Sequence, residues 1–300
     1  MSRPIALLAN PSAADGRSLK CLDAVRAELE ARGAEYRLAS PSGRDAARQV
    51  AREAAERGEV VAAVGGDGTI GLIAGALRGT GAPLAVIPAG RGNDFARVMQ
   101  IPTDPREAAR VALDGEERTV DVGEVDGEPF VCIASLGFDS DANRIDNEAT
   151  FIRGNLVYLY AALRALAGWK HASFHVVVDG ESHDLRGWSV AVANSKAYGG
   201  GMFIAPQAVL DDGKLDVVLV GESSKWTFLR DLREVFKGTH TANPHVRMLS
   251  GSKVELSADR PFTIYADGDA IGELPATVSI SPASLRVLVP KPSSKGLTPT

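Results

Sequence analysis

The chain has 300 residues, of which 45% are hydrophobic and 24% charged, as expected of a globular protein with a large core. This length predicts about two domains. The net charge is -5 and no basic block occurs, which argues against nucleic-acid binding. The two cysteines, Cys21 and Cys132, lie far apart without metal-ligand spacing, so we expect ordinary thiols in a reducing cytoplasm.

The N-terminal apolar run is too short for a secretory signal. The most membrane-like stretch, 155–169, is interrupted by Arg164 and is shorter than the roughly 20 residues that a membrane span needs. We therefore expect a soluble, cytoplasmic protein without a transmembrane segment, in which any contact with a membrane is peripheral.

The first half alternates apolar strands with helices. Buried strands are predicted at 4–11, 33–40, 60–65 and 83–89. Helices are predicted at 43–58, 69–79 and 103–115, the last with Thr103 as N-cap and with Pro105 and Glu107 in its first turn. This alternation predicts a parallel α/β sheet, whose ligands bind outside the C-terminal ends of its strands.

The second half shows the two-residue period of antiparallel strands, at 118–138, 174–194, 215–222, 252–269 and 277–290. Asp126-Gly127 and Asp179-Gly180 predict two-residue hairpin turns. Helices are expected near 151–168 and 225–236. The second helix is expected to pack one face into the core, formed by Trp226, Leu229, Leu232, Val235 and Phe236. The predicted domains are 1–122 and 123–290, followed by a disordered tail at 291–300.

A glycine-rich run, VGGDGT, ends the strand predicted at 60–65. Gly65, Gly66 and Gly68 allow the backbone to approach a ligand and to adopt positive φ. Thr69 can cap the next helix, whose N-terminal amides attract anions. The run lacks the pattern of a P-loop, and by itself it is equally consistent with a plain strand-to-helix turn. Asp67 places a negative charge where anions are usually bound.

A second turn of this kind, AGRGNDFAR at 89–97, follows the next predicted strand. Because parallel strands end at one edge of their sheet, we expect the two turns to converge on one crevice.

Together, GGDGT and the later GNDFAR resemble the diacylglycerol kinase and sphingosine kinase-like lipid kinases, which share a nucleotide-binding domain with NAD kinases and phosphofructokinases. Further blocks follow in the same order: CIASLGFDS at 132–140, VAVANSKAYGGGMFIAPQAVLDDGKLDVVLV at 190–220 and ADGD at 266–269. The resemblance covers nearly the whole chain. It implies an α/β fold, with a Rossmann-like parallel sheet domain followed by an antiparallel β-sandwich domain.

The resemblance also implies an ATP- and Mg²⁺-dependent kinase that phosphorylates the hydroxyl of diacylglycerol or a related lipid at a membrane surface. It assigns the role of base to Asp267. It implies a nucleotide and phosphate site formed by Asn10, Ser40, Gly65, Gly66, Asp67, Gly68, Thr69, Gly90, Arg91, Asn93 and Asp94. It implies a structural Mg²⁺ site made of the Asp212 side chain and the carbonyls of Val209 and Lys214.

The chemistry of phosphoryl transfer is consistent with these roles. The reaction needs a cation that neutralises the phosphates and an acceptor for the hydroxyl proton. Asp67 and Asp94 can hold Mg²⁺, directly or through water, and so need not repel the nucleotide. Asp267 and Asp212 are also suited to a purely structural role in turns.

The chain departs from the commoner family pattern at three positions. Leu72 replaces a Glu three residues past the Thr, Arg91 replaces a Thr, and Asp269 replaces the Glu of a DGE motif. Arg91 can donate two hydrogen bonds to phosphate oxygens, whereas Leu72 removes a polar partner. Two alternatives stay open: a kinase of a soluble acceptor such as NAD or a sugar, and a nucleotide- or lipid-binding regulator without catalysis. The sequence does not decide the lipid, the donor or the oligomeric state, for which a homodimer is one option.

Overall fold

The computed structural model describes residues 3–9, 17–138, 140, 166 and 168–292. The chain forms two compact units. The first contains residues up to Val120 together with those from Ser284 onward, and the second is Asp121–Ala283. The sequence-based boundary leaves 284–290 in the second domain, whereas the structure places them with the first, because the end of the last strand pairs there.

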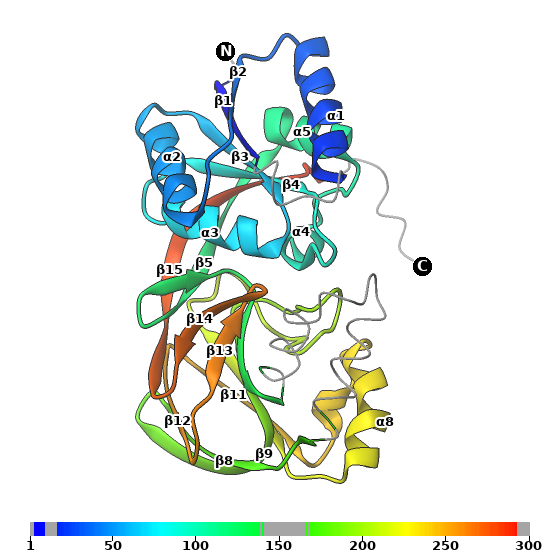
Figure 1. The fold of residues 1–300 in the computed structure, drawn as a ribbon, viewed down its shortest axis with the longest axis vertical. Coiled ribbons are helices and arrows are strands. Elements are labelled where there is room, and N and C mark those ends of the chain that lie inside the picture. Colours follow the sequence, from blue (N-terminus) through cyan, green and yellow to red (C-terminus); the bar gives the residue numbers. More distant parts are fainter. Residues whose placement is uncertain (1–2, 10–16, 139, 141–165, 167, 293–300) are drawn as a thin grey trace. The chain divides into compact units, whose positions relative to one another are not determined.

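The first unit is built around a parallel sheet (Figure 1). Its strand order is β2-β1-β3-β4-β15, and each neighbouring pair is parallel. The bounds are β1 (Ile5–Ala9), β2 (Tyr36–Ala39), β3 (Val60–Gly65), β4 (Pro83–Pro88) and β15 (Ala276–Val289), whose last residues belong to this unit. β1, β3 and β4 are buried throughout, as continuous apolar runs predict for a sheet covered on both faces.

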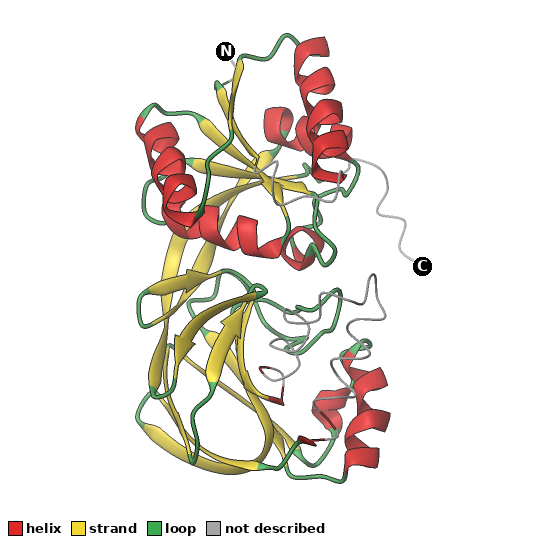
Figure 2. Cartoon of the chain, in the orientation of Figure 1, coloured by secondary structure: helices red, strands yellow, loops and turns green. Residues whose placement is uncertain are grey.

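Helices cover this sheet on both sides (Figure 2). They are α1 (Arg17–Ala31), α2 (Arg44–Glu56), α3 (Asp67–Leu77), α4 (Asp94–Val98) and α5 (Pro105–Asp114). α1 packs against α5, and α2 packs against α3. The helices predicted at 43–58, 69–79 and 103–115 are confirmed, whereas α1 was not among the predicted elements.

The N-cap predicted for α5 is wrong by one residue. Asp104, not Thr103, caps the helix, because its carboxylate accepts the N–H groups of Arg106 and Glu107 at 3.0 Å each. Pro105 then occupies the first helical position, where its missing N–H costs nothing.

The second unit is mainly antiparallel (Figure 2). Its elements are the end of β5 (Glu116–Val125), β6 (Glu128–Phe130), β7 (Ile133–Gly137), β8 (Ala172–Val178), β9 (Glu181–Ala193), β10 (Leu215–Gly221), α8 (Lys225–Val235), the 3-10 turn η2 (His240–Ala242), β11 (Val246–Gly251), β12 (Lys253–Ala258), β13 (Thr263–Ala266), β14 (Asp269–Glu273) and the start of β15. A sheet path runs β14-β13-β7-β9-β8-β12-β15, and β10 bridges β9 and β11. The predicted fold class, a parallel α/β part followed by an antiparallel part, is confirmed.

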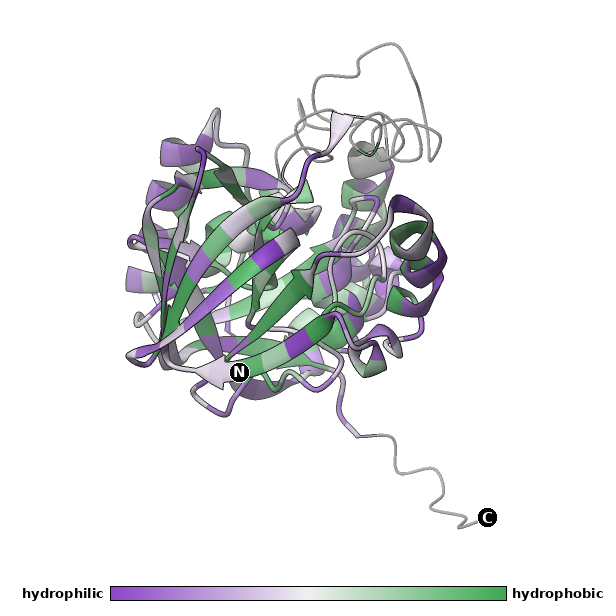
Figure 3. Ribbon diagram, turned by 90° about the horizontal axis from the view of Figure 1, so that it is seen from below, coloured by the Kyte–Doolittle hydropathy of each residue, from purple (hydrophilic) through white to green (hydrophobic). Residues whose placement is uncertain are grey.

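The predicted Asp-Gly hairpins are confirmed, with positive φ at both turn residues. Asp126 and Gly127 have φ values of 48° and 90°, and Asp179 and Gly180 have 46° and 89°. These angles suit the two-residue turns that match the twist of antiparallel strands. Hydrophilic and hydrophobic residues alternate along many strands (Figure 3), as expected for sheets with one face in a core.

The core of the second unit is aromatic at one end. Trp188 on β9 is fully buried and stacks on Phe228 of α8 with centroids 4.1 Å apart. Trp169 lies nearly parallel to Trp188 at 6.3 Å, and Phe138 meets both edge-on. These contacts fix the inner face of α8 against the sheet.

The core face predicted for the helix at 225–236 is wrong in part. Trp226 is 82% exposed and Phe236 is 51% exposed, whereas Leu229, Leu232 and Val235 are half-buried. The helix turns Phe228 and the buried Asp231 inward instead.

The helix predicted near 151–168 and the tail at 291–300 lie almost wholly outside the described residues. Among the described helices, none combines the length and the apolar character that crossing a bilayer requires.

Candidate phosphate and carboxylate sites

The two glycine turns of the first unit meet, as the sequence predicts. They follow the ends of β3 and β4, and the N–H of Ala89 donates to the carbonyl of Gly65 at 2.8 Å. A Cβ on Gly90 would lie 2.4 Å from the Cα of Gly66, and one on Gly66 would lie 3.2 Å from the Cα of Gly90. A side chain is therefore excluded at Gly90, and one at Gly66 would require the facing backbone to shift, because the two backbones are in contact.

The reason for glycine at these positions differs from the one expected. None of Gly65, Gly66 and Gly68 has a positive φ, and Gly66 is extended with φ −90° and ψ −176°. Space decides instead, since a Cβ on Gly65 would lie 2.6 Å from the Cβ of Thr69. The predicted cap by Thr69 is also wrong: α3 begins at Asp67, its N-cap is Gly66, and no side chain caps it.

Asp67 and Asp94 lie in the first turns of α3 and α4 and influence each other. The Phe95 N–H donates to Asp67 Oδ1 at 3.2 Å, which ties the two turns together. Burial, followed by the negative charge of Asp94, raises the pKa of Asp67 above its ordinary value. Asp94 is 3% exposed, and Arg97 donates to its Oδ1. Two neighbouring carboxylates that repel each other are a donor set that suits a hard cation such as Mg²⁺.

The Asn93 side chain closes the second turn on itself. Its Oδ1 accepts the Gly90 N–H at 2.9 Å, and its Nδ2 donates to the Gly90 carbonyl at 3.1 Å. Asn93 is left-handed, with φ 52°, a conformation that asparagine tolerates. Arg91, two residues before it, is exposed.

Of the other two residues assigned to the nucleotide site, the structure describes only Ser40. Ser40 follows β2 and is exposed, at the same edge of the sheet but on a strand that β1 separates from β3. Asn10 lies outside the described residues. Leu72, the departure from the commoner motif, is half-buried on α3.

In the second unit, Asp267 lies in the hairpin turn between β13 and β14. Its φ is 53° and that of Gly268 is 94°, so the turn geometry matches the two hairpins described above. The carboxylate is 8% exposed and accepts the N–H groups of Val131 at 2.7 Å and Cys132 at 2.9 Å. Asp267 therefore has a structural role, whatever else it does.

Two further hairpin aspartates share this arrangement but are exposed. Asp179 accepts the N–H groups of Ser252 and Lys253, and these bonds hold its pKa below the ordinary value. Asp126 accepts the N–H of Thr277 at 2.9 Å. Burial of the carboxylate is thus what separates Asp267 from its two counterparts.

Two buried residues that sequence reasoning did not single out, Asn194 and Asp121, connect Asp267 to the loop at 209–214. Asn194 is 1% exposed, and its Nδ2 donates to the carbonyls of Val131 and Asp121 at 3.0 Å each. The Asp121 carboxylate accepts the N–H groups of Gly213 and Ala283 at 2.7 Å. The only sequence signals were a polar residue inside one apolar strand, Asp121 in β5, and another directly after β9, Asn194.

The Asp212 loop offers oxygen donors without a complete described cage. Asp212 is exposed, and its Oδ1 accepts the Lys214 N–H at 3.0 Å. Val209 is 43% exposed. Burial, followed by the charge of Asp212, raises the pKa of Asp216, so added positive charge would be favourable here. Among the described residues, no group of three or more His, Cys, Asp or Glu side chains is arranged to hold a metal ion.

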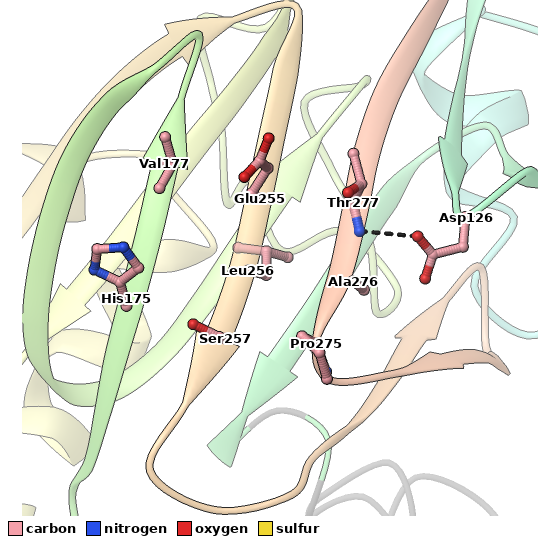
Figure 4. Close-up of a pocket in the computed structure, with 9 residues that line it drawn as sticks. All are labelled: Asp126, His175, Val177, Glu255, Leu256, Ser257, Pro275, Ala276 and Thr277. Carbon is pink, nitrogen blue, oxygen red and sulfur yellow. Dashed lines mark hydrogen bonds between the residues drawn. The ribbon is translucent and has the colours of Figure 1, made fainter.

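A hollow of about 370 Å³ on the second unit contains none of the predicted site residues (Figure 4). It is lined by side chains of β8, β12 and β15 and by Asp126, which accepts the Thr277 N–H. His175 and Glu255 in its wall are exposed, so it is a groove on the face of the sheet. We do not assign the candidate chemistry to it.

The arrangement of a parallel α/β unit and an antiparallel unit is shared with NAD kinase-like proteins. Yeast NADH kinase, solved in complex with NADH, has a TM-score of 0.53 at 9% identity, covering 98% of this chain and 85% of that chain. A putative diacylglycerol kinase from Bacillus anthracis str. Sterne has a TM-score of 0.80 at 20% identity, covering 96% of this chain and 95% of that chain. At these identities the likeness establishes the fold.

Comparison with family models assigns the chain to a family within this fold. Residues 4–125 match the diacylglycerol kinase catalytic domain, and 132–289 match the YegS C-terminal NAD kinase beta sandwich-like domain. A diacylglycerol kinase from Mycobacterium tuberculosis is 32% identical over 295 residues, covering 96% of this chain and 95% of that protein. A probable lipid kinase YegS-like from Pseudomonas aeruginosa is 31% identical over 248 residues, covering 81% of each. The chain belongs to the diacylglycerol kinase and YegS-like family of lipid kinases.

Proposed function

We propose that the chain transfers the γ-phosphoryl group of ATP to the hydroxyl of diacylglycerol or a related lipid, with Mg²⁺ required. The family implies a kinase that uses ATP and a lipid acceptor. The main structural support is the contact between the turns at Gly66 and Gly90, which bear the Asp67 and Asp94 carboxylates. Diacylglycerol is the first lipid to test because the Mycobacterium tuberculosis relative is named for it.

The proposed phosphate site is the first turn of α3. Its N-cap, Gly66, provides no side chain, so no cap accepts the first amides of the helix. Amides at a helix N-terminus attract phosphate through their N–H groups and the helix dipole. When bound, Mg²⁺ would neutralise the phosphate charge, and Asp67 and Asp94 are the residues proposed to hold it. The second proposed Mg²⁺ site is the Asp212 side chain with the carbonyls of Val209 and Lys214.

In the proposed step, the lipid hydroxyl oxygen attacks the γ-phosphorus, and the bond to the bridging oxygen breaks. The electron pair of that bond leaves with ADP, and the hydroxyl proton passes to the Asp267 carboxylate. The Oδ2 of this carboxylate accepts the Val131 N–H and its Oδ1 accepts the Cys132 N–H. The same two N–H groups hold the carboxylate in place.

Asp267→Asn alone is a poor test, because the new amide group would face a backbone N–H. Asp179→Asn is the matched control, since Asp179 accepts two backbone N–H groups in an equivalent turn. We expect both variants to lose stability, measured by urea unfolding. Only Asp267→Asn should also lose turnover, by about a hundredfold or more while still folded.

The assay uses labelled ATP with diacylglycerol, monoacylglycerol, sphingosine and NAD, with and without Mg²⁺. Turnover on diacylglycerol that survives Asp267→Asn would remove Asp267 from the mechanism. Turnover on NAD alone would indicate a soluble acceptor. Thermal stabilisation by ATP with no turnover on any acceptor would indicate a regulator, the alternative that Leu72 keeps open.

A further inference from the structure

The helix α8 exposes an aromatic edge. Trp226 is 82% exposed and Phe236 is 51% exposed, whereas the other two tryptophans, Trp169 and Trp188, are 6% and 0% exposed. At about 100° per residue, Phe236 and the half-buried Leu229 lie on the same side of the helix, within about 80° of Trp226. This edge is the main apolar feature that the helix presents outward.

The same face is cationic. Arg230 and Arg233 follow Trp226 by four and seven residues, which places them within about 40° of it around the helix, and Lys237 follows two residues after the helix ends at Val235. All three are exposed or half-exposed. Long basic side chains at this spacing can lie along the tryptophan while their charged ends reach a polar surface.

The acidic residues of α8 are turned away from Trp226, although the Nε of Arg230 donates to Asp231 Oδ1 at 2.9 Å. Asp231 is 6% exposed, and its Oδ2 lies 2.9 Å from His245 Nε2. Glu234 accepts the Asn243 Nδ2 hydrogen at 3.0 Å. The inner side of the helix is fixed by these contacts and by the stacking of Phe228 on Trp188, so the exposed face keeps its orientation within the second unit.

We propose that the surface formed by Trp226, Arg230 and Arg233 of α8, with Phe236 and Lys237 directly after the helix, docks on a bilayer that contains anionic lipid. Tryptophan is favoured at the boundary between headgroups and acyl chains, and Lys and Arg are attracted to anionic headgroups. Helices that lie in this boundary combine the two. A second copy of this chain is a poor partner, because a two-fold interface would place like charges opposite each other. The inference goes beyond the proposed reaction and does not depend on it.

Intrinsic fluorescence tests the docking directly, because Trp226 is the one exposed tryptophan of the three. The full chain is mixed with vesicles of phosphatidylcholine alone, or of phosphatidylcholine with phosphatidylglycerol, in the absence of ATP and diacylglycerol. We expect a blue shift, and quenching by brominated acyl chains, with the anionic vesicles only. High salt should weaken binding, and Trp226→Ala should remove the spectral change.

Variants that remove positive charge show whether this face is responsible for vesicle binding. Arg233→Gln with Lys237→Gln should weaken vesicle sedimentation by about fivefold per cation, or roughly thirtyfold together. Arg57→Gln with Lys253→Gln removes the same charge from exposed positions elsewhere and should have little effect. Equal losses in both pairs would overturn the proposal, as would unchanged fluorescence with anionic vesicles. A blue shift of Trp226 fluorescence that appears without vesicles and grows with protein concentration would overturn the proposal in favour of self-association.

Discussion

Gly66 lies where a side chain on Gly90 would have to be, since a Cβ at position 90 would come within 2.4 Å of the Gly66 Cα. The two strand ends are thus in backbone contact, and the carboxylates that follow each glycine turn come close enough to perturb each other. The close approach of the two turns that form the proposed phosphate site therefore depends on glycine at both positions.

Gly90→Ala should move one turn away from the other. A displacement near 1 Å at a reacting site can cost about a hundredfold, so we expect kcat/KM for ATP to fall by about that factor. Gly168→Ala is the control, because a Cβ there meets nothing within 4 Å. Steady-state kinetics with thermal melting would check this. Unchanged kcat/KM in Gly90→Ala would show that the turns need not touch.

Asp104→Ala should remove the cap of α5. Its carboxylate accepts two first-turn N–H groups, and losing such a cap typically costs about 1 kcal/mol of stability. Thr103→Ala should change the free energy of unfolding by only a few tenths of a kcal/mol. Urea titration of the two variants measures the difference. Equal losses of unfolding free energy in the two variants would mean that Thr103 contributes to the cap as much as Asp104 does.

Asn194→Ala should leave two buried carbonyls, of Val131 and Asp121, without their donor. Each unpaired buried group costs about 1–3 kcal/mol, so we expect a loss of at least that size in urea unfolding. Asn243→Ala, which removes one hydrogen bond from a more exposed residue, should cost less than about 1 kcal/mol. Similar losses would mean that the Val131–Cys132 segment is held by other contacts.

Stability should fall in mild acid partly through His240. Burial lowers its pKa below 6.5, and this outweighs its hydrogen bond to the Ile204 carbonyl and the charge of Glu234. Between the lowered folded pKa and 6.5 the unfolded chain binds more protons, so stability is full above 6.5 and declines below it.

The measurement compares urea unfolding about one pH unit above and below 6.5 for wild type and His240→Gln. The variant should lose less stability on acidification, because Gln does not titrate. Parallel losses in both proteins would assign the acid sensitivity to other groups.

The sequence was sufficient for most strands and for the two Asp-Gly hairpins, but not for β11, for most of β14 or for several side-chain roles. Apolar runs and Asp-Gly pairs determine local geometry, and both were found where predicted. Thr103 and Asp104 are both good caps, and only the backbone at the helix start distinguishes them. For α8, periodicity identified an apolar stripe, but the stacking of Phe228 on Trp188 decides which side faces inward.

In the candidate sites, too, the sequence predicted local features but not the contacts between distant residues. The glycine turns were predictable because parallel strands end at one edge, and their contact follows from that. Asn194, by contrast, bonds to carbonyls 73 and 63 residues earlier in the chain, and no local pattern encodes such a partner. A turn role for Asp267 was foreseen as an alternative, but its bonds to the Val131 and Cys132 N–H groups could not be predicted before the strands were paired.

The last strand also affects how the chain can be made. Arg286 and Val287 pair with Pro83 and Leu84, so β4 gains this neighbour only after about 200 further residues have been synthesised. Until then β4 offers unpaired N–H and C=O groups, a template for pairing with another chain. The parallel sheet of the first unit is therefore completed only after the second unit has been synthesised. We expect a shortened chain that stops after Val120 to expose the apolar edge of β4 and to aggregate.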